Sequence, residues 1–305
     1  MVKPLLKWVG GKTQILEEVL SRFPEEMSEY HEPFVGGGSV LLELLSRVRD
    51  GRIRISNKRI TVYDINPWLI MLYTNVRDNV EEFIYECRVI QGEYDSCEEM
   101  NGGRTPTCRE EALLSKESYY YWTRGLFNTE RLREGIPRGR TAARLVFLNK
   151  MGFRGLYREG PRGYNVPFGN YKNPRMIDED NVREISRLFR EAGVSFQCCD
   201  FREALCYTEP GAFVYCDPPY APETSTSFVG YVSGGFILKD HQDLFETMWG
   251  LRERGVRFLM NNSGVRLVRE AFPVSEGFIV DEVEARRAIH SRNPAARTVE
   301  VIIRG

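Results

Sequence analysis

Two prolines between an acidic and an aromatic residue give the strongest chemical signal in the sequence. The tetrapeptide Asp217-Pro218-Pro219-Tyr220 follows an apolar run, 212–216, that is typical of a fully buried strand. Consecutive prolines fix the backbone and lack N–H donors, so the carbonyls around them stay available as acceptors. Asp217 adds a carboxylate acceptor and Tyr220 a flat ring. This combination suits the binding of an exocyclic amine, whereas an ordinary proline turn would explain the prolines alone.

Two further segments place ligand-binding groups directly after predicted strands. A strand ending near Phe34 leads into the turn Gly36-Gly37-Gly38, and glycines let a backbone approach a ligand closely. Asp64 lies in the predicted strand 60–65, near its end, where a carboxylate can accept hydrogen bonds from ribose hydroxyls. Glycine-rich turns also occur where nothing binds. The loop lacks the G-x-G-x-x-G pattern of dinucleotide enzymes, so no pyrophosphate ligand is indicated.

The segment LKWVGGKTQ, residues 6–14, looks at first sight like a phosphate-binding P-loop. A P-loop needs a glycine five residues before its Gly-Lys-Thr, because backbone amides along the whole turn close on the phosphates. Leu6 occupies that position, which excludes a P-loop. A Gly-Gly turn before an amphipathic helix accounts for the apolar residues that follow, namely Ile15, Leu16, Val19 and Leu20.

Composition narrows the class of protein. The chain has 305 residues, of which 42% are hydrophobic and 28% charged, as in an ordinary globular protein, and no apolar run is long enough to cross a bilayer. Seven cysteines without a CxxC pair suit reduced thiols in the cytoplasm, and Cys198, Cys199, Cys206 and Cys216 are expected in apolar or buried surroundings. With three histidines, we expect no metal centre.

Strands that alternate with helices predict an α/β fold with a mostly parallel sheet. Besides the segments above, we expect helices after the glycine turn, from about Pro67 and over 240–251. We expect further strands at 194–198, 256–260 and 298–303. Residues 90–190 interrupt this alternation with helices near 117–126 and 142–150, followed by glycine-rich turns. We therefore predict one domain formed by 1–89 and 191–305, with 90–190 as an inserted, mainly helical domain.

The inserted region is basic although the whole chain is not. From Asn101 to Lys172 there are 14 Lys and Arg against 6 Asp and Glu, a balance of +8, so the rest of the chain carries −9 of the net charge of −1. Aromatic residues are interleaved with these arginines. Charge alone fits a solvated surface equally well, but basic residues mixed with aromatic rings and glycine turns also describe a surface that binds nucleic acid.

Seven segments in order resemble one family, the DNA adenine-N6 methyltransferases of the Dam type. They are LKWVGGK (6–12), EPFVGGGSV (32–40), VYDIN (62–66), GFRGLYR (152–158), NVPFGNYKNP (165–174), CDF (199–201) and VYCDPPYAP (214–222). The resemblance spans nearly the whole chain. It implies a Rossmann-like methyltransferase fold, with 90–190 as the target-recognition domain, and transfer of a methyl group from S-adenosylmethionine to an adenine flipped out of duplex DNA.

The resemblance also assigns residues to the cofactor and to catalysis. The expected cofactor contacts are Trp8, Lys12, Phe34, Gly36, Gly38, Asp64, Asp200, Phe201 and Asp217. Asp64 would bind the ribose, and Asp200 and Phe201 the adenine of the cofactor. The expected catalytic set is Asp217, Pro218, Pro219 and Tyr220, with Tyr220 stacked on the flipped base. Asp217 and the Pro218 carbonyl would accept hydrogen bonds from its amine.

For DNA, the resemblance points to Lys7, Phe153, Arg154 and Arg158. Arginine can read a guanine edge with two hydrogen bonds, and Lys7 falls where family members touch the first guanine, so GATC is the leading expectation for the target. Arg154 departs from the asparagine usual in the family. The loop 222–236 is expected to move over the bound base. A cognate restriction endonuclease is an expected partner.

Other readings stay open at this point. Cytosine-N4 methyltransferases share the fold and a similar tetrapeptide, but more often carry serine in place of Asp217. RNA is a less favoured substrate. A catalytically inactive DNA-binding module is disfavoured by the intact Lys12, Asp64 and DPPY. The missing dinucleotide fingerprint disfavours a nicotinamide-dependent oxidoreductase.

Overall fold

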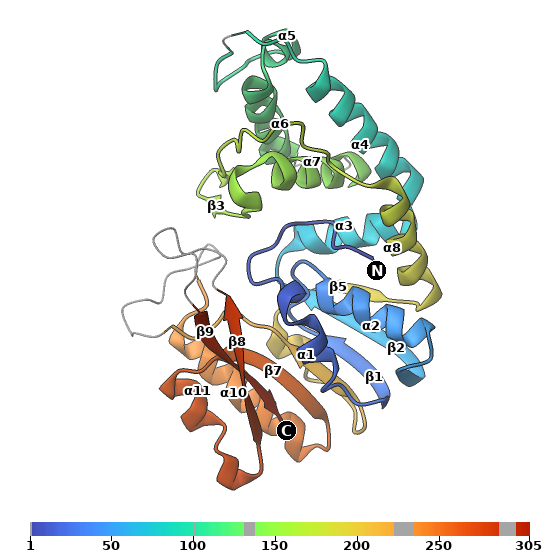
Figure 1. Cartoon of the computed structure of the whole chain (residues 1–305), viewed down its shortest axis with the longest axis vertical. Coiled ribbons are helices and arrows are strands. Elements are labelled where there is room, and N and C mark those ends of the chain that lie inside the picture. The colour runs from blue at the N-terminus through green and yellow to red at the C-terminus, as the bar shows by residue number, and fades with distance from the viewer. Residues whose placement is uncertain (1, 101, 131–137, 223–234, 287–296) are drawn as a thin grey trace. The chain divides into compact units, whose positions relative to one another are not determined.

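The computed structural model describes residues 2–100, 102–130, 138–222, 235–286 and 297–305 (Figure 1). The chain divides into two compact units. Unit 1 comprises Met1–Gly11, Gly36–Gly38 and Asn66–Glu191, and unit 2 comprises Lys12–Val35, Ser39–Ile65 and Ala192–Gly305. The long segment of unit 1 thus begins at Asn66, upstream of the predicted domain boundary at 90, because the helices after Asn66 pack with those of the inserted region.

Unit 2 is built on a seven-stranded sheet with the order β5-β2-β1-β6-β7-β9-β8. Its strands are β1 Glu26–Glu32, β2 Arg54–Asp64, β5 Ser195–Cys198, β6 Phe213–Cys216, β7 Arg257–Ser263, β8 Ile279–Arg286 and β9 Arg297–Arg304. The first five are parallel, whereas β9 runs antiparallel to both β7 and β8. The predicted mostly parallel sheet is therefore confirmed.

Short helices and two long ones precede or connect these strands. They are η1 Lys12–Gln14, α1 Leu16–Leu20, α2 Ser39–Arg49, α9 Phe201–Ala204, α10 Leu238–Glu253, α11 Arg266–Ala271 and η4 Val274–Glu276. Leucines and valines on α2 are buried, and one hydrophobic core joins β6, β7 and β9 to α10, with Val214, Leu244, Met260 and Val301 fully buried. All four residues of β6 are buried, as the apolar run predicted.

The order of the strands creates a switch point between β1 and β6. From β1 the chain moves outward to β2 and later β5, and from β6 it moves in the opposite direction to β7. In open parallel sheets, the crevice for ligands lies at the carboxyl ends of the strands beside such a reversal. The fold therefore predicts that a ligand binds near the residues that follow Glu32 and Cys216.

Unit 1 is mainly helical. It contains α3 Pro67–Asp78, α4 Val80–Asp95, α5 Arg109–Leu113, α6 Lys116–Glu130, α7 Arg138–Met151, η2 Phe153–Gly155, α8 Glu179–Glu191 and the small hairpin β3 Glu159–Gly160 with β4 Gly163–Tyr164. Pro67 begins α3 as predicted, and the side chain of Asn66 caps it by accepting the Trp68 N–H. Buried aromatic rings of Tyr94, Tyr119 and Phe147 hold α4, α6 and α7 together.

Some local predictions need correction. Cys198 and Cys206 are exposed, and only Cys216 of the four cysteines expected in apolar surroundings is buried. Cys198 lies at the end of β5, an edge strand, where one side of the sheet has no neighbouring strand to cover it. β8 occupies a segment for which the sequence predicted no strand. Among the described residues, no helix is long and apolar enough to cross a membrane.

Candidate active site

The sheet of unit 2 brings four sequence-predicted residues to the ends of neighbouring strands. Asp200 follows β5, Asp64 ends β2, Phe34 follows β1 and Asp217 follows β6, and these four strands are consecutive in the sheet. Because the strands are parallel, their carboxyl ends lie along one edge. The structure therefore arranges these residues in one row, in the order Asp200, Asp64, Phe34 and Asp217.

Asp217 pairs with Lys12 inside this row. The Lys12 ammonium lies 2.7 Å from Asp217 Oδ1, and the two side chains are only 6% and 19% exposed. Burial raises the pKa of Asp217, and the neighbouring Lys12 opposes that rise by stabilising the carboxylate. The same ammonium lies 4.9 Å from the centre of the Tyr220 ring. Lys12, from the segment 6–14 that resembled a P-loop, thus forms an ion pair with Asp217.

Tyr220 and the residue after it are held from β7 and β9. The Tyr220 hydroxyl donates to Glu300 Oε2 at 2.7 Å. The Ala221 N–H donates to Asn262 Oδ1 at 2.9 Å, and the Ser263 hydroxyl donates to the Ala221 carbonyl at 2.5 Å. Burial is the main cause that raises the pKa of Tyr220, with Asp217 and Glu300 adding to it, so the phenol stays neutral. In the sheet, β7 and β9 lie on the side of β6 that faces away from β1, so these contacts hold the loop after β6 from that side.

Glu32, the last residue of β1, is a buried acid beside the row. Its side chain accepts the Tyr30 hydroxyl at 2.8 Å, and the residue is only 2% exposed. Burial raises the pKa of Glu32 to about 8, and the negative charges of Asp217 and Asp64 add to the rise. Glu32 is therefore largely protonated at neutral pH, which limits the negative charge accumulated at the strand ends.

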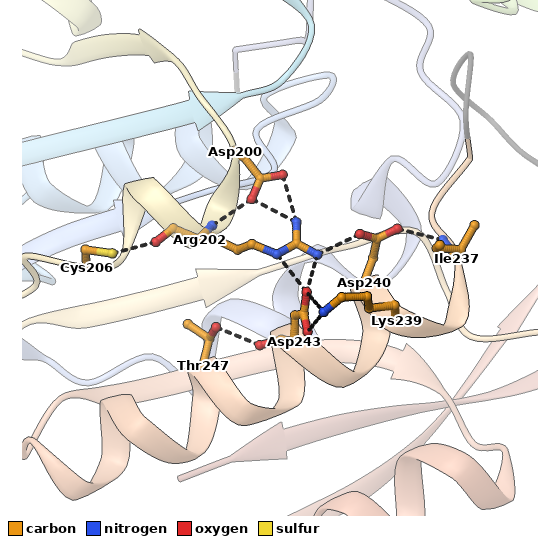
Figure 2. A network of polar contacts seen from close by, with 8 residues as sticks. All are labelled: Asp200, Arg202, Cys206, Ile237, Lys239, Asp240, Asp243 and Thr247. Carbon is orange, nitrogen blue, oxygen red and sulfur yellow. Dashed lines mark hydrogen bonds and ion pairs between the residues drawn. The ribbon is translucent and has the colours of Figure 1, made fainter.

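An apolar wall stands at the β5 end of the row. The ring of Phe34 lies 5.7 Å from that of Phe201 and 6.1 Å from that of Phe236, measured between centroids. Asp200 precedes α9 and caps it, since its Oδ1 accepts the Arg202 N–H at 2.9 Å. Asp200 also belongs to a network of charged groups around Arg202 (Figure 2).

The glycine turn belongs to unit 1, where it packs against Trp8. A Cβ on Gly37 would come within 2.9 Å of the Trp8 Cβ, and one on Gly36 within 3.0 Å of the indole. Gly36 and Gly38 also have positive φ angles, 46° and 71°. Tyr73 fixes the turn by donating its hydroxyl to the Gly36 carbonyl at 2.6 Å. Both the space and the backbone angle therefore require glycine at position 36.

The four residues predicted to touch DNA also lie in unit 1, and all are exposed. Arg154 has a φ of 57°, unusual for a residue with a side chain, and its N–H donates to the Tyr171 hydroxyl at 2.6 Å. The Lys7 ammonium lies 5.0 Å from the centre of the Tyr171 ring. Phe153 precedes Arg154 and is 43% exposed. Lys7 and Arg154 thus both contact Tyr171.

Arg158 is held by Asn165, the residue that follows β4. Its Nε donates to Asn165 Oδ1 at 2.6 Å, and its Nη2 lies 3.3 Å from the Asn165 carbonyl oxygen. Asn149 ties the N-terminal segment to η2. Its Oδ1 accepts the Lys7 N–H, and its Nδ2 donates to the carbonyl oxygens of Lys7 and Gly155. The hairpin is braced by Asn128 of α6, whose side-chain amide bonds both the N–H and the carbonyl of Tyr164.

Comparison with known proteins identifies the family. The sequence pattern of the D12 class N6 adenine-specific DNA methyltransferases matches residues 8–289. The chain belongs to this family. It is 34% identical to the type II methyltransferase M.MjaIII of Methanocaldococcus jannaschii, over 95% of this chain and 94% of that one. It is 32% identical to the DNA adenine methylase of Haemophilus influenzae, over 97% and 90% of the two chains. It is 29% identical to the DNA adenine methylase of Escherichia coli K12, over 99% of this chain and 94% of that one.

This adenine-N6 DNA methyltransferase therefore uses a methyl donor and acts on DNA. The expected Rossmann-like methyltransferase fold is confirmed by the sheet together with the family, and the cytosine, oxidoreductase and inactive-module readings give way to adenine methylation. Sequence reasoning missed four polar residues at the row, Glu32, Arg202, Asn262 and Glu300. A charged residue within an otherwise apolar strand, as at Glu300, was the one local signal available.

Proposed function

We propose that the methyl donor is S-adenosylmethionine and that it binds along the row of strand ends in unit 2. The observation that carries this proposal is the order of the residues along the sheet. Asp200 offers an acceptor for the adenine amine and Asp64 one for ribose hydroxyls, while Phe34 and Phe201 offer rings for the base. Asp217 comes last, beside Lys12. When bound, the cofactor supplies an electrophilic methyl group on a sulfonium centre.

Lys12 suits the carboxylate end of this cofactor, because its ammonium is buried and already faces the reacting side of the row. We assign cofactor contacts also to Trp8, Gly36 and Gly38, since the glycine turn follows Phe34 directly in the chain. The absence of a side chain at position 36 lets the turn pack directly against Trp8, so we assign Trp8 and the turn to the cofactor together.

In the proposed mechanism, Asp217 and the Pro218 carbonyl accept hydrogen bonds from the amine of an adenine flipped out of the duplex. These bonds draw the nitrogen lone pair away from the ring and aim it at the methyl group. Pro219 keeps the turn rigid and Tyr220 stacks on the base, its ring held by Glu300. The nitrogen would form its bond to the methyl carbon as the bond from that carbon to the sulfonium sulfur breaks, its electron pair going to sulfur. The proton that the nitrogen then releases would go to Asp217. Asp217 must therefore be ionised beforehand, and Lys12 favours that state.

We further propose that unit 1 reads the target sequence, with residues 90–190 as the target-recognition domain. Lys7, Phe153, Arg154 and Arg158 are exposed on or beside a braced hairpin, which suits contacts to phosphates and base edges. Arg158 would read one guanine, Lys7 the other and Phe153 fill the gap near the extruded base, so GATC is the proposed target. The predicted mobile loop lies largely at 223–234, outside the described residues.

The test is methylation of short duplexes with labelled S-adenosylmethionine. A duplex that contains one GATC site should gain label as N6-methyladenine, whereas a duplex of the same composition with the site scrambled should not. Asp217→Ala should abolish transfer while it largely spares binding of the GATC duplex. Label in N4-methylcytosine, or transfer retained by Asp217→Ala, would refute the mechanism. Label in the scrambled duplex would refute GATC alone.

A second proposal concerns the biological context. The relatives from M. jannaschii and Lactococcus lactis are named type II methyltransferases. We propose that a restriction endonuclease of the same specificity accompanies this enzyme, and that both act on DNA in the cytoplasm. A gene for such an endonuclease beside the methyltransferase gene would support this proposal. A methyltransferase gene alone, in a cell whose GATC sites no nuclease cuts, would contradict it.

A further inference from the structure

Arg202 lies at the centre of three carboxylates that come from two separate segments (Figure 2). Its Nη1 donates to Asp200 Oδ1 and Oδ2 at 3.0 and 3.2 Å. Its Nη2 donates to Asp240 Oδ1 at 2.6 Å, and Nε and Nη2 donate to Asp243 Oδ2 at 2.9 and 2.7 Å. Asp240 and Asp243 belong to the first turns of α10, whereas Asp200 precedes α9. The planar guanidinium therefore joins α10 to the loop after β5.

The two anchors on α10 are fixed by other partners. Asp240 Oδ2 accepts the Ile237 N–H at 2.8 Å at the start of the helix, and Lys239 pairs with Asp243 at 2.9 Å. Partial burial disfavours the charge on Arg202, but the hydrogen bonds that it donates to Asp240, Asp243 and Asp200 outweigh this effect and raise the pKa of Arg202. Arg202 thus stays charged, with its fork held on two sides by the helix.

The guanidinium of Arg202 determines which further hydrogen bonds the Asp200 carboxylate can accept. Oδ1 accepts two N–H groups, from the Arg202 backbone and from Nη1, while Oδ2 accepts only the longer of the two Nη1 bonds. A carboxylate oxygen can accept two hydrogen bonds. Among the described residues, Oδ2 therefore keeps one acceptor position. Because the carboxylate is held both by the helix cap and by the guanidinium, that position has a fixed direction.

We propose that Arg202 is a positioning residue that makes the enzyme selective for the 6-amino group of its cofactor. This inference rests on the proposed function, in which Asp200 accepts a hydrogen bond from that amine. A carboxylate that is already fixed accepts the bond without loss of side-chain freedom, whereas a mobile one would lose part of the gain. Arg202 touches no reacting atom, so its contribution lies in binding and not in the transfer step.

The test compares two cofactor products by calorimetry, S-adenosylhomocysteine and the analogue in which hydrogen replaces its 6-amino group. We expect the wild type to prefer the amino compound by about 10- to 100-fold, the effect of a hydrogen bond to a charged group. Arg202→Ala should reduce this preference to about threefold or less. Lys239→Ala is the matched control, because Lys239 belongs to the same network without touching Asp200, and it should keep the wild-type preference.

The ratio of affinities separates positioning from general stability. If Arg202→Ala weakens both compounds by the same factor, or leaves their ratio unchanged, the inference is overturned. Arg202→Lys keeps a positive charge among the carboxylates and serves if the alanine variant does not fold. Lacking the planar fork, it should also lose at least about threefold in preference, and an unchanged ratio would refute the proposal.

Failure of the proposed function has a different signature. A wild-type protein that binds neither compound, or binds both equally, would refute the proposed cofactor or the role of Asp200. A wild type that discriminates, with Asp200→Ala abolishing the discrimination and Arg202→Ala preserving it, would refute the role of Arg202 alone. In a double-mutant cycle, adding Arg202→Ala to Asp200→Ala should cause no further loss of preference.

Discussion

At the scale of single residues, the chemistry depends on which acids near the strand ends carry charge. Asp217 and Asp64 both lie within electrostatic reach of Glu32. Lys12 compensates one charge by pairing with Asp217, and protonation removes that of Glu32. The site thereby keeps an ionised acceptor at Asp217 without collecting three negative charges in a partly buried volume.

Replacing Lys12 should shift the pH dependence of catalysis. Because the ammonium lowers the pKa of Asp217, Lys12→Met should raise that pKa, and activity at low pH should be lost first. The acid limb of the kcat profile, measured at saturating cofactor, should therefore move to higher pH by about one unit or more. Lys12→Arg, which keeps the charge, should move it less. Superimposable acid limbs for all three proteins would contradict the assignment of Asp217.

Glu32 should make the protein less stable as pH rises. Its pKa is about 8 in the folded protein against 4.5 for an ordinary glutamate, so the folded state holds a proton that the unfolded state loses. The resulting stability is complete below the lower value, decreases by up to about 1.4 kcal/mol per pH unit between the two, and is gone above the higher. Glu32→Gln should lack this loss. Urea unfolding at several pH values should show the difference growing up to pH 8 and then levelling; a constant difference would contradict it.

At the scale of elements, β9 contributes to the site through the side chain of Glu300. Glu300 lies on β9 and receives the hydroxyl of Tyr220, which belongs to the loop after β6. Removing this acceptor should let the ring leave its position. We expect Glu300→Ala to lower kcat by about ten- to a hundredfold, as small displacements of positioning groups do. Glu300→Gln, which still accepts the hydroxyl, should stay close to wild type. Equal losses in single-turnover measurements of the two variants would argue for a charge effect instead.

The hairpin of β3 and β4 should set specificity through Arg158. Arg158→Ala should relax the preference at one guanine of the target by about 1–3 kcal/mol, and Asn165→Ala should act in the same direction, since Asn165 holds the guanidinium. Arg162, exposed in the same hairpin, provides the control. Relative kcat/KM values on duplexes substituted at each position would measure the effect. A uniform loss on all duplexes would identify a phosphate contact.

The sequence predicts elements well where the signals are local. Glycine and proline punctuation placed one strand end close to Asp64 and another directly before Asp217, and Pro67 marked the start of α3. It does not predict partners that lie far apart in the chain. Glu300 is 80 residues from Tyr220, and Asp243 is 41 from Arg202, so no pattern could connect them. The exposure of Cys198 follows from its edge strand, which is a property of the sheet order and not of the residue.

At the scale of the whole molecule, charge is divided between regions. The stretch from Asn101 to Lys172 carries +8 while the remainder carries −9, a division that the net charge of −1 conceals. DNA binding should therefore depend strongly on salt. Between about 50 and about 200 mM salt, we expect the affinity for a duplex to fall at least about tenfold, as two or more phosphate contacts require. Fluorescence anisotropy would measure it, and an affinity insensitive to salt would contradict a basic DNA surface.

Each of the two units is formed by three separate segments of the chain, and this affects the order in which they can fold during synthesis. During synthesis, Lys12, Phe34 and Asp64 leave the ribosome first, then the continuous segment 66–191, and last the strands that complete the sheet. The helical segment can therefore acquire its structure while β1 and β2 still wait for β6 to join them. Because Asp217 and Glu300 are synthesised late, the helices of the segment 66–191 can form well before the chain has the residues proposed for methyl transfer. We therefore expect full methyltransferase activity only after β9, the last strand, has been translated.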